Sequence, residues 1–252
     1  MPVAVGRGNT WRERLETPVR WVGAAVGLAV NKLVSYSPEP DVDLLYGFAV
    51  FGLCVMASAF VADVVARQRP GPLRVARVTS RRIQNYVPRG LTAAVAVQAT
   101  VLVILLVIAA ATASPDAAGR SGRALSITCP AGAQLLSPWP GPYYAWPILG
   151  GLAFGTVACA LLLRRVTARS GSDEQRRTGA RAAIGSWGVL VCAPLFGVSL
   201  TMGVVVLSLS CGGEMKSVAL WGLAITALIS ALTAGHCLCV SLLPQVYVRK
   251  QP

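Results

Sequence analysis

The sequence predicts an all-α fold, a polytopic transmembrane helix bundle with six spans, five strong and one weak and N-terminal. Five stretches are long, apolar and almost free of charge. Since a helix rises about 1.5 Å per residue, roughly 20 residues cross a hydrocarbon core about 30 Å thick. Apolar residues make up 54% of the chain and charged residues only 13%, about half the charged share of soluble domains. Arginine-rich segments separate the stretches, as in proteins that cross a membrane several times.

The five strong stretches occupy residues 44–66, 91–113, 145–163, 184–208 and 218–243. The connections between them leave no room for a soluble domain with its own core. We therefore expect one transmembrane bundle domain over 21–252, preceded by a cytoplasmic N-terminal segment, 1–20. The connections 67–90 and 114–144 are long enough to hold small structured elements.

The basic residues predict the topology, because short cytoplasmic loops carry an excess of Lys and Arg. Loops 67–90 and 164–183 hold seven and six arginines and are expected inside, whereas loop 114–144 is expected outside. With both termini cytoplasmic, 19 basic residues lie inside and three outside. The net charge of +13 thus follows from membrane topology, and we expect no nucleic-acid partner. The abundance of Arg, Ala, Gly and Val indicates GC-rich codons, so we expect the plasma (inner) membrane of a bacterium.

The weak span covers residues 21–37 and completes this topology, because five crossings would place the N-terminal arginines outside. It is apolar apart from Asn31 and Lys32, whose ammonium can reach the outer interface. Gly23, Gly27 and Asn31 form a stripe that permits close helix contact. Two alternatives stay open: an interfacial helix, supported by an apolar stripe on the other face, and a cleaved signal peptide, whose cleavage site would be poor.

Two of the seven cysteines, Cys129 and Cys211, fall in the predicted outer connections. Disulfides form outside the cytoplasm, so we expect these two residues to be bonded to each other. The alternative is a pair of free thiols. The other five cysteines fall within spans, where cysteine commonly serves as a small packing residue.

Three polar side chains inside spans form a candidate intramembrane polar site: Asp63, Gln98 and His236. Ionisable residues in a membrane are costly, which makes each a functional candidate. Asp63 can instead reach interfacial water or pair with Arg67, and His236 can be a packed, hydrogen-bonded residue. His236, Cys237 and Cys239 do not share one helical face, so no metal site is expected there.

Loop 67–90 has the pattern of a basic amphipathic helix, with Arg74, Arg77 and Arg81 on one stripe and apolar residues on another. Such a helix anchors to anionic lipid headgroups at the inner leaflet. The alternative is a docking element for a cytoplasmic or membrane protein partner.

Loop 114–144 ends in a run of Pro, Trp and Tyr between residues 138 and 147. These residues are typical of an aromatic belt at the membrane interface, and they also suit a binding surface for a ligand or partner. We further expect close-packing faces at Gly151 and Gly155, and at Ala227, Ala231 and Gly235.

No catalytic motif, paired carboxylates or metal-ligand cluster is present, so we expect no enzymatic activity, cofactor or metal. The function expected is that of a non-enzymatic membrane component of a transport, sensing or envelope complex. A small permease acting alone is the first alternative, because Pro194 interrupts a span as in some transporters. A membrane-embedded enzyme is the second. The sequence predicts contact with the lipid bilayer but no oligomeric state.

Overall fold

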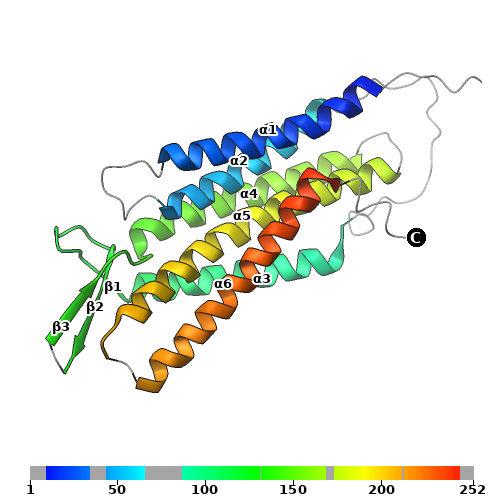
Figure 1. The fold of residues 1–252 in the computed structure, drawn as a ribbon. Coiled ribbons are helices and arrows are strands. Elements are labelled where there is room, and N and C mark those ends of the chain that lie inside the picture. Colours follow the sequence, from blue (N-terminus) through cyan, green and yellow to red (C-terminus); the bar gives the residue numbers. More distant parts are fainter. Residues whose placement is uncertain are drawn as a thin grey trace, which may run out of the picture.

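The computed structural model describes residues 10–34, 44–65, 87–130, 132–168, 173–211 and 213–244, which form six helices and a small sheet (Figure 1). The helices are α1 (Thr10–Val34), α2 (Leu44–Val65), α3 (Arg89–Ala111), α4 (Pro142–Ala168), α5 (Asp173–Ser208) and α6 (Gly213–Leu242). Helices α2 to α6 are each long and apolar enough to cross a membrane, which confirms the predicted all-α bundle.

Helix α5 occupies the centre of the bundle and packs against α2, α3, α4 and α6. Two thirds (67%) of its most apolar window is buried, against 22–39% in the other four spans. Their remaining apolar side chains face outward, as expected for surfaces in contact with lipid. Helix α5 continues through Pro194 as one element of 36 residues.

Helix α1 lies antiparallel against α2 (Figure 1). Its small residues make the contact: a Cβ atom at Gly27 would lie 3.0 Å from Cys54 and Phe51, and one at Gly23 would overlap Ser58. The predicted small-residue stripe is therefore the contact face. Helix α1 is not among the described helices that are long and apolar enough to cross a membrane, so the sixth span stays a prediction.

The apolar windows of the sequence underestimate the lengths of four helices, α1, α4, α5 and α6. Helix α1 begins at Thr10, eleven residues before the predicted span, and ends at Val34. The predicted loop 164–183 is largely helical, because α4 runs to Ala168 and α5 begins at Asp173. Apolarity marks only the part of a helix that lies in lipid, whereas charged residues such as Arg and Glu continue a helix beyond it.

The two ends of the bundle differ in charge. We call the end where α1, α3 and α5 begin and α2, α4 and α6 finish the arginine end, and the opposite end the cap end. The described arginines at the arginine end include Arg20, Arg89, Arg164, Arg165, Arg176, Arg177 and Arg181. Both termini of the described chain lie there, since Arg20 of α1 contacts Ser241 of α6.

A three-stranded antiparallel sheet stands at the cap end, in the order β1 (Ala113–Ser114), β2 (Ala124–Cys129), β3 (Gly132–Leu136). Residue pairs run from Leu125↔Leu136 to Cys129↔Gly132. The sequence did not predict these strands, since two or three short alternating segments are stable only when paired and packed against a larger core. The sheet provides that packing through Leu125, which joins the apolar cluster at this end of the bundle.

The predicted close-packing faces have different outcomes. On α4 a Cβ atom at Gly155 would overlap Leu190 of α5, so this position is a close contact, and one at Gly151 would lie 3.8 Å from Leu53. On α6 the prediction is wrong within this chain, because Ala231 and Gly235 are exposed and a Cβ at Gly235 would meet nothing within 4 Å. Small-residue spacing shows where close approach is allowed but does not specify the neighbour.

Candidate functional site

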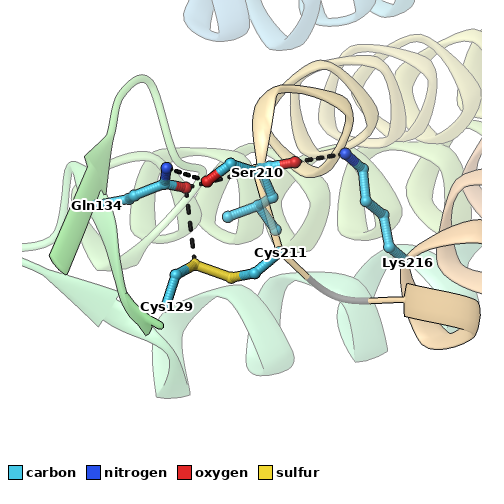
Figure 2. Close-up of a disulfide and its surroundings, with 6 residues drawn as sticks. Cys129, Gln134, Ser210, Cys211 and Lys216 are labelled. Carbon is cyan, nitrogen blue, oxygen red and sulfur yellow. Dashed lines mark hydrogen bonds between the residues drawn. A yellow bond between two sulfur atoms is a disulfide. The ribbon is translucent and has the colours of Figure 1, made fainter. Parts of the chain in front are cut away.

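The most elaborate arrangement of polar groups in the described chain is at the cap end. We call the three strands with their connections (112–130 and 132–141), together with residues 209–211, the cap. Cys129 closes β2, Cys211 follows α5, and their sulfur atoms are bonded, with the Cα atoms 5.9 Å apart (Figure 2). This is the pair that the sequence predicted. The bond joins segments 82 residues apart and fixes the sheet to the linker between α5 and α6.

Gln134 of β3 adds a second attachment beside the disulfide (Figure 2). Its amide Nε2 donates to the hydroxyl of Ser210, and its Oε1 accepts from the backbone N–H of Ser210 at 3.2 Å. Lys216, at the start of α6, donates to the carbonyl of Leu209. The α5–α6 linker is therefore held from the sheet on one side and from α6 on the other.

Trp139 connects the cap to the end of α3. Its indole N–H donates to the carbonyl of Ala109 at 2.9 Å, and the side chain is only 4% exposed. The last four carbonyls of a helix have no partner within the helix, so this bond satisfies one of them inside the protein. The backbone N–H of Trp139 donates to the carbonyl of Arg123 at 2.8 Å, which joins the segment after β3 to the residue before β2.

An aromatic cluster joins the cap to α2 and α4. The hydroxyl of Tyr46 donates to the carbonyl of Tyr143 at 2.9 Å, and the rings of Tyr46, Tyr143 and Tyr144 lie 5.0–5.7 Å apart. The guanidinium carbon of Arg123 lies 3.7 Å from the centre of the Tyr143 ring, a close cation–π contact. The predicted aromatic run therefore includes side chains that fix the cap to the bundle.

The turn between β1 and β2 is organised by Asp116. Its carboxylate accepts from the backbone N–H groups of Ala118 and Arg120 and from the Arg120 guanidinium, at 2.8–2.9 Å. Desolvation raises the pKa of Asp116, but these hydrogen bonds and the nearby positive charge outweigh it, so the pKa lies below its usual value. Gly119 and Gly122, both with φ of 77°, supply the left-handed conformations that the turn requires.

The structure does not bring the three predicted intramembrane polar residues together. Gln98 of α3 donates to the hydroxyl of Thr233 on α6 at 2.8 Å, one turn before His236, which is exposed. Asp63 lies on α2, which packs mainly against α1, α4 and α5. Among the described residues, no group of three or more His, Cys, Asp or Glu could hold a metal ion.

Sequence reasoning missed a buried polar chain at the arginine end. Arg20 is 6% exposed and donates to the carbonyl of Ser241 at 3.4 Å. The hydroxyls of Ser241 and Ser186 are 2.8 Å apart, and Ser186 bonds the carbonyl of Ala182. Arg20 thus binds a carbonyl in the last turn of α6, where a cation also interacts favourably with the helix dipole. In the sequence, Arg20 stands just before an apolar segment and indicated only the topology, not a buried contact.

The predicted amphipathic helix with Arg74, Arg77 and Arg81 lies outside the described residues, and its role stays a prediction. Comparison with protein-family models, with curated proteins and with solved structures finds no match for this chain. The description that the observations support is that of a multi-pass membrane protein with a disulfide-fixed cap at one end of its bundle.

Proposed function

We propose that this chain is a non-enzymatic membrane component of a transport, sensing or envelope complex, and that its cap meets a partner outside the cytoplasm. The observation that carries the proposal is the rigid attachment of the cap to the bundle. The disulfide and the Gln134–Ser210 hydrogen bonds hold the sheet to the linker between α5 and α6. The Trp139–Ala109 bond joins the cap to α3, and the contact of Arg123 with the Tyr143 ring joins it to α4. A surface held in one conformation loses little entropy when a partner binds.

The orientation follows from two independent arguments. The cap holds the disulfide, which forms in extracytoplasmic compartments. The opposite end holds most of the described arginines, which favour the cytoplasmic side. Both arguments put the cap outside and both termini inside, with α1 as a sixth crossing.

The centre of the bundle also supports this proposal. Helix α5 fills it with apolar side chains: Leu190, Val191 and Leu195 are all at most 1% exposed. A permease built on this fold would need to open the seams around that helix. A role in presenting a fixed outer surface needs no such rearrangement.

One observation favours the small permease as a second candidate. Gln98 Oε1 and Ser199 Oγ are buried and have no hydrogen-bond partner among the described residues. Both lie on helices of the bundle interior, where a polar solute or water could satisfy them. Proton or solute flux into liposomes containing the purified chain alone, lost in Gln98→Leu, would support this alternative.

The main proposal is tested by purification of the tagged full chain from native membranes in mild detergent. The comparison uses the wild type, the Cys129→Ser/Cys211→Ser double variant, and Cys239→Ser as the control for removal of an exposed cysteine elsewhere. We expect the same stoichiometric partner with wild type and Cys239→Ser, and its loss from the double variant. A wild-type chain without any such partner, or a partner retained by the double variant, would refute the role of the cap.

A further inference from the structure

The outer edge of the sheet has the features of a site for strand addition. Within the part of the chain that the structure describes, the strand order β1-β2-β3 gives β3 a neighbour on one side only. Strand β3 contains no charged residue, no proline and no bulge in its five-pair register with β2. Proteins commonly protect open edges with such devices, because unpaired N–H and C=O groups are a template for another strand.

The register identifies the backbone groups that are available. Cys129 and Gly132 close the hairpin, and hydrogen-bonded pairs alternate with non-bonded pairs from there on. Gly132, Gln134 and Leu136 therefore direct their backbone groups to β2. Ala133 and Leu135 direct theirs away from it, which gives two donors and two acceptors along the free edge.

The side chains separate in the same way. Gln134 bonds the α5–α6 linker and Leu136 packs against the apolar cluster below the sheet. Ala133 is exposed and Leu135 is 46% exposed, on the face opposite to the bundle. An added strand would thus meet free backbone groups and two small or apolar side chains, with no charge to desolvate.

The position of the edge decides which occupant can reach it. Strand β1 directly follows α3, and β3 lies two strand spacings further on, each about 4.8 Å. In Figure 1 the edge of β3 points away from the helices. A second copy in the same membrane has its own cap at the same height and cannot approach this edge from above. A water-soluble chain outside the membrane can.

We propose that β3 binds an extended, uncharged polypeptide segment of an extracytoplasmic partner, which adds to the sheet as a fourth strand beside Ala133 and Leu135. This deepens the proposed function and rests on its placement of the cap outside. The disulfide and the Gln134–Ser210 bonds hold β3 extended beforehand, so that the ordering of the site costs little when the segment binds.

The test is hydrogen–deuterium exchange of the segment 132–136 in the full chain, in native membrane vesicles and after purification in detergent. The variant Ala133→Pro removes one outward N–H, and proline is tolerated where the N–H faces away from the ladder. Ala133→Ser is the matched control and keeps the N–H. Each variant is first checked for the Cys129–Cys211 disulfide by its mobility without reductant.

We expect exchange in vesicles to be slower by about tenfold or more than after purification, for wild type and Ala133→Ser. Ala133→Pro should exchange equally fast in both. If this variant does not form the disulfide, Leu135→Lys takes its place and Leu135→Thr is the matched control, because a lysine on an edge strand opposes pairing. No protection in vesicles, or protection that persists in Ala133→Pro or Leu135→Lys, would overturn the proposal.

A photoreactive residue at Thr128, which pairs with Ala133 on the outer face, identifies the occupant. An adduct with a different, extracytoplasmic chain supports the proposal, whereas an adduct of twice the chain mass would show a second copy and overturn it. A partner that co-purifies normally with Ala133→Pro would refute strand addition while leaving the proposed function intact. The absence of any cap-dependent partner would refute both.

Discussion

Leu190 of the central helix is held between two glycines, and this contact allows a sharp test of the packing. A Cβ atom at Gly52 of α2 would lie 2.6 Å from the Cα of Leu190 and 3.2 Å from its Cβ. A Cβ at Gly155 of α4 would overlap only the end of the Leu190 side chain. At Gly150, also on α4, an added Cβ would meet nothing within 4 Å.

The three Gly→Ala variants should therefore differ in a fixed order. In a helix, alanine is favoured over glycine by about 1 kcal/mol, so Gly150→Ala should be neutral or slightly stabilising. Overpacking costs typically about 1–3 kcal/mol. In Gly155→Ala the end of the Leu190 side chain can rotate away, which reduces the overpacking cost, and alanine is favoured in the helix. The net destabilisation should therefore be about 0–2 kcal/mol. Gly52→Ala meets backbone, which cannot rotate away, and should cost about 1–3 kcal/mol or more.

The assay is the temperature at which half of the purified protein remains monodisperse in size-exclusion chromatography after heating in detergent. We expect the order Gly150→Ala, Gly155→Ala, Gly52→Ala, from the most to the least stable. The double variant Gly155→Ala/Leu190→Val should be more stable than the sum of the two single changes predicts, since the shorter side chain makes room for the new methyl. Equal stability of all three single variants would refute the assignment of Leu190 as the contact between α2, α4 and α5.

The other predictions concern the cap and the topology. Without reductant, Cys129 and Cys211 should resist maleimide labelling. In the chain-entropy model their disulfide stabilises the folded protein by about 4.5 kcal/mol, which is an upper limit because the helices between the two cysteines restrict the unfolded chain. Trp139→Phe should lower the stability of the cap by about 0.5–1.5 kcal/mol, measured by limited proteolysis, because it removes the shorter of two hydrogen bonds to the Ala109 carbonyl, the other being donated by Thr112. Folding lowers the pKa of Asp116, so the ionised carboxylate stabilises the folded cap. This stabilisation is complete above the unfolded pKa of about 3.9 and is lost as pH falls through the folded pKa. Asp116→Asn should remove this pH dependence from the rate of cap proteolysis. Reporter fusions at both termini should behave as cytoplasmic, and an active extracytoplasmic fusion at the N-terminus would remove α1 from the crossings.

The sequence by itself determined the membrane class, the five strong spans and the pairing of two cysteines. Apolar stretches of about 20 residues have one stable environment, the bilayer, so their length and composition are sufficient. The pairing of Cys129 with Cys211 followed from compartment alone, because only these two cysteines fell in the predicted outer loops. These inferences need no knowledge of which helix touches which.

Only the tertiary structure decided which helix is central, where the glycines pack and what the cap looks like. Gly155 and Gly235 occur in similar small-residue patterns, yet one contacts Leu190 and the other faces outward. Strand β3 exists because β2, the disulfide and the Ser210 linker support it, and five residues have no such stability alone. Contacts between distant segments depend on the relative rotation and order of the helices, which apolarity along one segment does not encode.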